Sequence, residues 1–253
     1  MYQEERMLKI VDYLQLHKRI SVDDICEFFN VSRDTARRDL VKLEEHQKII
    51  RTRGGALLPT LHHDPIGNYN ERLLTVSEEK QVIGQLAASM VRDKDRIILD
   101  SSTTVQACAE RLNVQECSVI TNSINQADVL SGKDGVSIHL LGGRLQKEHR
   151  YVYGSSVIAT LSHYFVDKAF IGIGGISVHG LSLIHEEDGM LKHQMMKQAD
   201  QVIVLADHSK FGINFPYRFA DLSEVNIVIT DRLPEPAMLE ILQHYDVEVV
   251  VPS

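Results

Sequence analysis

The sequence predicts an α/β protein with two domains of unequal size: a small one of helices and a β-hairpin, then a larger Rossmann-like one with a mostly parallel sheet. Over residues 1–58, helical periodicity is followed by a strand–glycine–strand pattern. Over residues 76–253, β-prone and helical runs alternate, which is typical of a parallel sheet covered by helices. Residues 59–75 contain two prolines and a glycine without apolar periodicity, so we expect a linker there.

The composition is that of an ordinary globular protein: 253 residues, 43% hydrophobic and 25% charged. Its three cysteines, Cys26, Cys108 and Cys117, have no metal-ligand spacing, so we expect plain thiols in a reducing compartment. No apolar run approaches about 18 residues, and the first residues contain no apolar signal segment. A cytoplasmic protein without a membrane span is therefore expected.

Charge is distributed unevenly along the chain. The net charge is −8, yet residues 1–58 carry 11 Lys/Arg and 10 Asp/Glu, a net of +1, which leaves −9 for the remainder. Within residues 33–53, seven basic side chains face four acidic ones. A small basic patch on an acidic body suits a protein that contacts phosphates with one face only.

The N-terminal elements follow from short local signals. A helix is expected over residues 4–16, and a second helix ends near Asn30, which tolerates the left-handed conformation. Ser32 is a good N-cap for a third helix, and residues 49–56 read as a strand, a glycine turn and a return strand. Three helices and a β-hairpin form a winged helix-turn-helix.

The larger domain contains seven β-prone runs and six helical ones. Strands are expected over 96–100, 118–121, 136–141, 168–172, 201–206, 226–230 and 247–251. Helices are expected over 77–91, 103–112, 123–131, 155–164, 186–198 and 234–244.

The third helix carries a candidate DNA-reading face. At about 100° per residue, one narrow apolar face is expected to pack inside; it consists of Ala36, Leu40 and Leu43. Arg38 points away from this face, with Arg33 and Arg37 on one flank. Such arginines could reach guanine edges in the major groove. At the helix start, Ser32 and Thr35 could hold a phosphate.

The hairpin adds a second positive element. Arg51 and Arg53 lie beside the turn Gly54–Gly55, a tip suited to the DNA backbone or minor groove. Taken alone, the helix could be a solvated charged face with pairs such as Asp34–Arg38. Two adjacent positive elements favour DNA binding instead.

A candidate ligand site follows the first strand of the larger domain. The stretch ILDSSTT at 98–104 is an apolar strand that ends in Asp100 and four hydroxyl residues. Ligands bind beyond a strand's carboxyl end, at the start of the next helix. Asp100 could accept from a sugar hydroxyl, and four hydroxyls could donate to a phosphate: Ser101, Ser102, Thr103 and Thr104. The alternative is an ordinary capped strand–helix turn.

Other loops at predicted strand ends show similar chemistry and would converge on one edge of a doubly wound sheet. The candidate binding residues in them are Thr121, Asn122, Ser123, Gly142, Gly143, Gly174, Gly175 and Lys210. Lys210 would supply a cation, while the glycines either let the backbone approach a ligand or make tight turns.

The segment VSRDTARRDLVKLEE followed by IIRTRGGA resembles the signature of the DeoR family of bacterial sugar regulators. The resemblance implies a winged helix-turn-helix, with characteristic positions at Ser32, Thr35, Arg37 and Arg38. Two residues depart from the usual pattern: Gln47 stands where the family has glycine, and Arg53 where it has histidine.

The larger domain also resembles that family, through ILDSSTT, TNS, LGG, FIGIGG through HEED, and VLADHSKFG. The family's sensor domain is related to ribose-5-phosphate isomerase. The resemblance implies a repressor of a sugar catabolism operon, released from its double-stranded DNA operator by a phosphorylated sugar. We expect a homo-oligomer that reads repeated half-sites. Ser102 replaces a glycine usual in the family.

Three enzyme classes are disfavoured. The isomerase relatives place catalytic carboxylates in the segment corresponding to 170–175, which contains none here, and isomerisation needs a positioned base. Gly172-x-Gly174-x-x-Ser177 lacks the third glycine of a nicotinamide fingerprint. His185 has no second histidine at helical spacing, so neither metal nor cofactor is expected. The other alternative is a DNA-binding protein that has no ligand. A thermal-shift screen with sugar phosphates would distinguish it from a ligand-controlled regulator.

Overall fold

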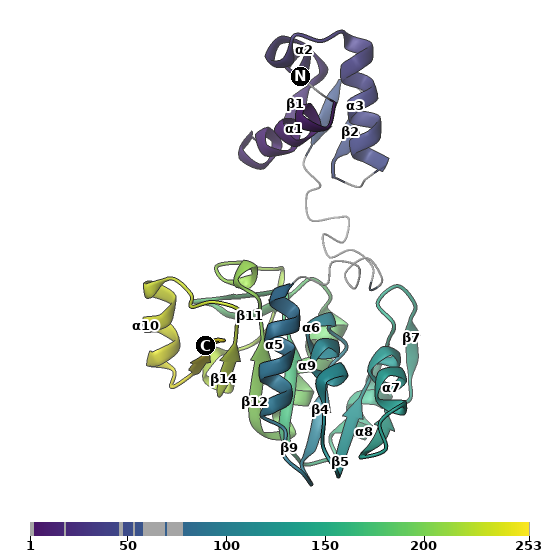
Figure 1. Cartoon of the computed structure of the whole chain (residues 1–253), viewed down its shortest axis with the longest axis vertical. Coiled ribbons are helices and arrows are strands. Elements are labelled where there is room, and N and C mark those ends of the chain that lie inside the picture. The colour runs from purple at the N-terminus through teal and green to yellow at the C-terminus, as the bar shows by residue number, and fades with distance from the viewer. Residues whose placement is uncertain are drawn as a thin grey trace. The chain divides into compact units, whose positions relative to one another are not determined.

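The computed structural model describes residues 3–17, 19–45, 48–52, 54–57, 69 and 78–252. The chain divides into two compact units, residues 1–67 and 68–253 (Figure 1). The expected linker, 59–75, lies outside the described residues except for Tyr69, which belongs to the second unit.

The first unit is a winged helix-turn-helix. Its elements are α1 (Gln3–His17), β1 (Arg19–Ser21), α2 (Val22–Phe29), α3 (Arg33–Glu45), β2 (Ile50–Thr52) and β3 (Gly55–Leu57). The expected hairpin is present, and β1 adds a third antiparallel strand in the order β1-β3-β2. Ile10, Leu14, Ile25 and Leu40 are among the buried residues that join the three helices.

Local chemistry explains where these elements begin and end. The Ser21 hydroxyl accepts from the Asp24 N–H at 3.0 Å, and the Asp24 carboxylate accepts from the Ser21 N–H at 2.9 Å, which starts α2. Asn30 closes α2 in the left-handed conformation, with φ of 50°. Gly55 is required by close approach, because a Cβ there would lie 2.0 Å from the Ile20 carbonyl oxygen.

The second unit is built on a seven-stranded sheet in which every pairing is parallel. The strand order is β15-β14-β12-β9-β4-β5-β6. The bounds are β4 (Arg96–Leu99), β5 (Cys117–Thr121), β6 (Val136–Leu140), β9 (Val166–Gly172), β12 (Ala199–Leu205), β14 (Ile227–Ile229) and β15 (Glu248–Val250). The predicted α/β fold class is confirmed, and each predicted strand is found within about two residues of its expected bounds.

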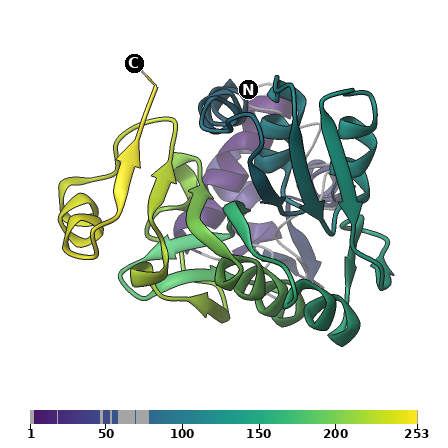
Figure 2. The same ribbon diagram turned by 90° about the horizontal axis from the view of Figure 1, so that it is seen from below.

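Helices cover both faces of this sheet (Figure 2). On one face lie α5 (Glu78–Ser89), α6 (Thr103–Arg111) and α7 (Ile124–Ser131), and on the other lie α8 (Ser155–Leu161), α9 (Glu186–Lys197) and α10 (Pro236–His244). Alternation along β4 feeds both layers, since Ile97 and Leu99 pack in the first and Ile98 in the second.

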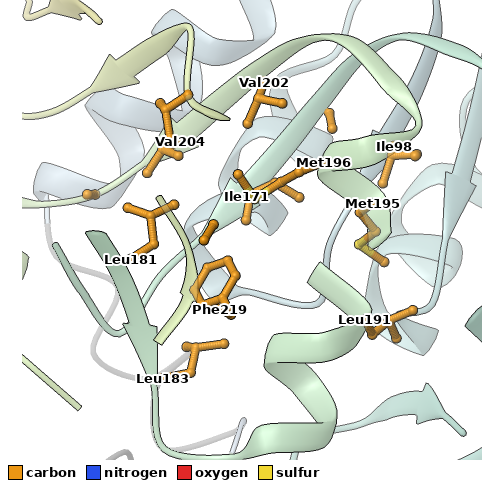
Figure 3. Close-up of a cluster of buried hydrophobic side chains, with 14 of the residues drawn as sticks. Ile98, Ile171, Leu181, Leu183, Leu191, Met195, Met196, Val202, Val204 and Phe219 are labelled. Atoms are coloured by element: carbon orange, nitrogen blue, oxygen red, sulfur yellow. The ribbon is translucent and has the colours of Figure 1, made fainter. Parts of the chain in front are cut away.

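Short antiparallel elements were not predicted. They are the hairpin β7 (Arg144–Gln146) and β8 (Tyr151–Tyr153), and the sheet of β10 (Gly175–Ser177), β11 (Gly180–Leu183) and β13 (Tyr217–Ala220). Two short 3-10 helices, η1 (His208–Lys210) and η2 (Leu222–Glu224), also belong to this unit. Figure 3 shows that Leu181 and Phe219 of the small sheet share a core with Leu191 and Met195 of α9.

The cysteines have the character expected of plain thiols. Cys108 and Cys117 are buried, Cys26 is half-buried, and all three are free. Burial raises the pKa of the Cys117 thiol to about 11, so little reactive thiolate forms near neutral pH. Among the described residues there is no helix long and apolar enough to cross a membrane, and no cluster of three or more His, Cys, Asp or Glu suited to a metal ion.

Candidate DNA interface and effector site

Helix α3 divides into a buried face and an exposed basic one, as its periodicity predicted. Ala36, Leu40 and Leu43 are at most 3% exposed. Arg37 and Arg38 stand in solvent on the other side.

The arginines of this surface differ in how they are held. The Arg33 guanidinium pairs with the Asp23 carboxylate at 2.6 Å. Arg38 Nε donates to the carbonyl of Asp34 at 3.3 Å. Within the described residues, the side chain of Arg37 forms no hydrogen bond or ion pair. Exposed pairs of this kind are worth about 0–1 kcal/mol, so a DNA phosphate can displace the carboxylate.

Among its described residues, the hairpin supplies one further exposed cation. Arg51 Nη1 lies 3.2 Å from Glu44 Oε2, and both side chains are well exposed. Gly54 lies exposed at the turn. Arg53 and Gln47 lie outside the described residues, so two positions that depart from the family pattern have no structural description.

The start of α3 carries two interacting hydroxyls. Ser32 Oγ accepts from the Thr35 N–H at 3.2 Å and lies 2.9 Å from Thr35 Oγ1. Ser32 therefore acts as the predicted N-cap. Because only one of the two hydroxyls donates to the other, one hydroxyl proton is left over for an outside acceptor such as a phosphate.

A buried ion pair that the sequence reasoning missed fixes α3 to α1. Arg6 Nε lies 2.5 Å from Asp39 Oδ2, and Arg6 Nη2 donates to Asp39 Oδ1 at 3.1 Å. The Gln3 amide also donates to Asp39, at 2.8 Å. The carboxylate hydrogen bond raises the pKa of Arg6. No local sequence pattern predicts this pair, because Asp39 lies 33 residues from Arg6.

In the second unit, the candidate ligand site lies where the sheet order reverses. The strand β4 has β5 on one side and β9 on the other, and the chain winds outward in both directions from there. Open α/β sheets bind ligands in the crevice beyond the carboxyl ends at such a switch point. Residues 100–104, called the hydroxyl loop below, follow β4 at this edge.

The structure gives Asp100 a set of partners within the protein. Its Oδ1 accepts from the Ser102 N–H at 2.8 Å, and its Oδ2 accepts from the Gly172 N–H at 2.7 Å. Lys192 of α9 forms an ion pair with the same Oδ2 and donates to the Gly172 carbonyl at 2.9 Å. Asp100 and Lys192 are 1% and 3% exposed. Asp100 therefore ties the hydroxyl loop to β9 and α9, a role that the sequence did not suggest.

Ser102, which replaces a usual glycine, lies beside Gly172 at the end of β9. Its Oγ accepts from the Val105 N–H at 3.2 Å and so caps α6. A Cβ on Gly172 would lie 2.1 Å from this Oγ, so the serine side chain occupies the room beside that glycine.

Within the part of the chain that the structure describes, several polar atoms near the hydroxyl loop lack partners. Ser101, Thr103 and Thr104 are at most 8% exposed, and within the described residues their hydroxyls form no hydrogen bond. Asn122, at the end of β5, donates through Nδ2 to the Val152 carbonyl at 3.2 Å. Its Oδ1 is buried without a hydrogen-bond partner in the described part of the chain. Buried orphan acceptors are rare, so this oxygen marks a place for an outside donor.

The remaining candidates fall into two groups. Thr121 Oγ1 accepts from the Ser123 N–H at 3.1 Å, and the Ser123 hydroxyl donates to Gln126 at 2.8 Å, so both are engaged inside the protein. The glycines differ: Gly142 faces open space, whereas a Cβ on Gly143, Gly174 or Gly175 would meet Val157, Phe215 or Ile213 respectively at 2.5, 2.9 or 2.3 Å.

The far part of the same edge holds a His–Asp pair and the last candidate, Lys210. The backbone N–H of His208 donates to Asp231 Oδ1 at 2.6 Å, and the ring Nδ1 of His208 lies 2.7 Å from Asp231 Oδ2. Burial raises the pKa of Asp231, but these two contacts outweigh it and lower the pKa overall. Ser209 bonds to Asp207 instead, so no Ser-His-Asp triad forms. Lys210 lies in η1, two strands from β4.

A winged helix-turn-helix with a basic helix face, followed by a parallel-sheet unit with polar residues at its switch point, defines a two-domain DNA-binding regulator. Residues 6–61 match the DeoR-like helix-turn-helix domain, and residues 75–232 match the DeoR C terminal sensor domain. The chain therefore belongs to the DeoR family, as the sequence motifs indicated, and is a regulator and not an enzyme.

Relatives of this chain are named as regulators. It is 61% identical over 251 residues to the HTH-type transcriptional repressor GlcR of Bacillus subtilis, covering 99% of this chain and 97% of the relative. It is 29% identical over 251 residues to the glycerol-3-phosphate regulon repressor of Escherichia coli, covering 98% and 99%.

Solved structures show more distant similarities. Ribose 5-phosphate isomerase A of Methanocaldococcus jannaschii matches at 20% identity and a TM-score of 0.37, covering 56% of this chain and 55% of that one. The eIF2B beta protein of Chaetomium thermophilum matches at 16% identity and a TM-score of 0.45, covering 63% and 50%. The chain thus spans about half the length of these structures.

Proposed function

We propose that this protein represses a sugar catabolism operon in the cytoplasm and leaves its operator when a phosphorylated sugar binds beside the hydroxyl loop. The observation that carries the proposal is a group of polar atoms that have no partner among the described residues: the hydroxyls of Ser101, Thr103 and Thr104, and Oδ1 of Asn122. The match to a sensor domain and the names of the two relatives support it.

These atoms suit the two ends of a sugar phosphate. The helix α6 begins at Thr103, so its first N–H groups and its dipole favour a phosphate there, with hydroxyls to donate further bonds. Asn122 Oδ1 can accept only, which fits a sugar hydroxyl. The nearby Asp100 carboxylate is neutralised by Lys192, so it does not repel an anion. Lys210 adds a cation from the same sheet edge.

Release from DNA requires two coupled sites. In this proposal, a homo-oligomer pairs two winged helices on repeated half-sites, which gives an affinity that one small domain lacks. The effector favours an arrangement that misplaces them, with a coupling of about 1–3 kcal/mol.

The first test is the melting temperature of the full chain with glucose 6-phosphate, glycerol 3-phosphate, glucose and inorganic phosphate. We expect a phosphorylated compound to raise it, since a ligand at about 100 times its Kd adds about 2.7 kcal/mol of stability. An equal response to glucose, or no response to any phosphorylated compound, contradicts a sugar-phosphate effector.

The second test separates the pocket from the DNA surface. The Thr103→Ala variant should keep its operator affinity but be released less by the phosphorylated compound that stabilises the wild type. Thr160→Ala on the exposed side of α8 is the matched control. Unchanged release from DNA in the Thr103→Ala variant would show that the phosphate binds elsewhere.

A gel shift at low salt with the upstream region of the protein's own gene tests the DNA surface. If the protein does not retard this DNA, the proposed DNA surface is contradicted.

A further inference from the structure

A tyrosine from the segment between the two matched domains is buried inside the second unit. Tyr69 is fully buried, and its backbone N–H donates to the Glu148 carbonyl at 2.9 Å. It lies twelve residues beyond Leu57, where β3 of the first unit ends. Residues 58–68 and 70–77 lie outside the described residues, so Tyr69 is the described point at which this segment meets the second unit.

The hydroxyl of Tyr69 lies between two glutamines. It donates to Gln106 Oε1 and lies 3.5 Å from Gln126 Oε1. Gln106 belongs to α6, the helix that begins in the hydroxyl loop, and its amide nitrogen donates to Glu110 at 2.8 Å. Tyr69 is therefore bonded to the helix whose first turn faces the proposed phosphate.

Gln126 connects the same tyrosine to the backbone of the hydroxyl loop. This side chain is fully buried, and its Nε2 donates to the carbonyl of Asp100 at 2.6 Å and to that of Ser102 at 3.1 Å. Its Oε1 accepts from the Ser123 hydroxyl at 2.8 Å. One amide thus joins two candidate effector loops to Tyr69.

We propose that Tyr69, acting through Gln126 and Gln106, is the positioning residue that passes effector binding to the segment leading to the DNA-binding unit. The proposal rests on the proposed function. A phosphate that draws the hydroxyl loop toward itself moves the carbonyls of Asp100 and Ser102, on which Gln126 is fixed. In a buried network a lost partner is not replaced by water, so a shift of one member displaces the others.

The test compares Tyr69→Phe with the wild type in the full chain. The variant keeps the buried ring and loses only the hydroxyl. Operator affinity is measured by fluorescence anisotropy with and without glucose 6-phosphate, glycerol 3-phosphate and inorganic phosphate, and the Kd of each compound is measured by calorimetry. Tyr245→Phe, at a partly exposed tyrosine, is the matched control.

In the wild type and the control we expect about tenfold or greater loss of operator affinity at a saturating phosphorylated compound. In Tyr69→Phe we expect the Kd for that compound to stay within about twofold and the loss of operator affinity to fall below about threefold. An undiminished loss overturns the proposal. Parallel loss of compound binding also overturns it, because Tyr69 would then belong to the ligand site itself.

A measurement without ligand keeps the two proposals distinguishable. Hydrogen exchange of the amides in residues 100–106 should be faster in Tyr69→Phe, while exchange in β12 stays unchanged. Equal exchange in both proteins overturns the positioning role. If none of the three compounds stabilises the wild type, the proposed function fails and the coupling fails with it, and the exchange result then decides the positioning role alone.

Discussion

The basic residues of α3 stand in solvent, whereas the polar residues of the hydroxyl loop are buried or half-buried. On α3, Arg37 has no partner within the described residues, Arg38 bonds to a backbone carbonyl, and Arg33 pairs with Asp23 through side chains that are 63% and 72% exposed. In the hydroxyl loop, Asp100 pairs with Lys192, and their side chains are 1% and 4% exposed. An anion can therefore replace the partners on α3 at little cost, while the Asp100 side chain is paired before any ligand arrives. The following predictions test this contrast, from the largest effect to the smallest.

The largest effect is expected from Lys192→Met. Removing one member of a buried ion pair leaves the other charge uncompensated, which costs about 3–5 kcal/mol of unfolding free energy. Urea denaturation of the full chain measures it. Lys197→Met on the exposed side of the same helix should change stability by less than about 0.5 kcal/mol. Similar small losses in both variants would show that Asp100 does not depend on Lys192.

A smaller loss is expected from Gly172→Ala. The new methyl group would overlap Ser102 Oγ, which lies 2.1 Å from the Cβ position, and overpacking of this kind costs about 1–3 kcal/mol. The double variant Gly172→Ala with Ser102→Gly should recover most of that loss, and a double-mutant cycle by urea denaturation measures the recovery. Additive losses would rule out this packing contact.

On the exposed surface, Arg38→Ala should leave unfolding unchanged and weaken operator binding by about 1–3 kcal/mol, with relaxed preference at one base position. Binding to a set of single-base operator variants measures both effects. The control is Arg92→Ala, an exposed arginine of the second unit. Equal weakening on specific and random DNA would assign Arg38 to a phosphate contact.

The smallest effect is expected from Glu44→Gln. This carboxylate pairs with Arg51 at 3.2 Å, and its removal should strengthen binding to random DNA by about twofold to threefold, because an exposed pair is worth about 0–1 kcal/mol. Anisotropy at several salt concentrations measures the change. Weaker binding in the variant would mean that Glu44 holds Arg51 in its DNA-binding position.

Much of the fold followed from periodicity. Buried parallel strands are continuous apolar runs, such as Ile97–Leu99, so their positions were found within about two residues. The strands that escaped prediction are three or four residues long, and some carry polar residues, as β7 does with Arg144 and Gln146. So short a run has no detectable period, and pairing with distant partners decides its conformation.

The candidate site was predictable only where side chains face solvent. The exposed arginines of α3 follow from the position of each residue on a helix. The roles of Asp100 and Gln126 do not, because Asp100 meets Lys192 at a separation of 92 residues and Gln126 meets Ser102 at 24. The effector residues themselves remain predictions.

The buried charge pair between Arg6 and Asp39 has a consequence for how operator preference can change. Because this buried pair holds α3 against α1, the angle between the two helices does not depend on the exposed side chains of α3. If Arg37 and Arg38 contact bases as proposed, exchange of either would alter which base pairs are contacted while the helix keeps its place. In this chain, operator preference could then change one outward residue at a time.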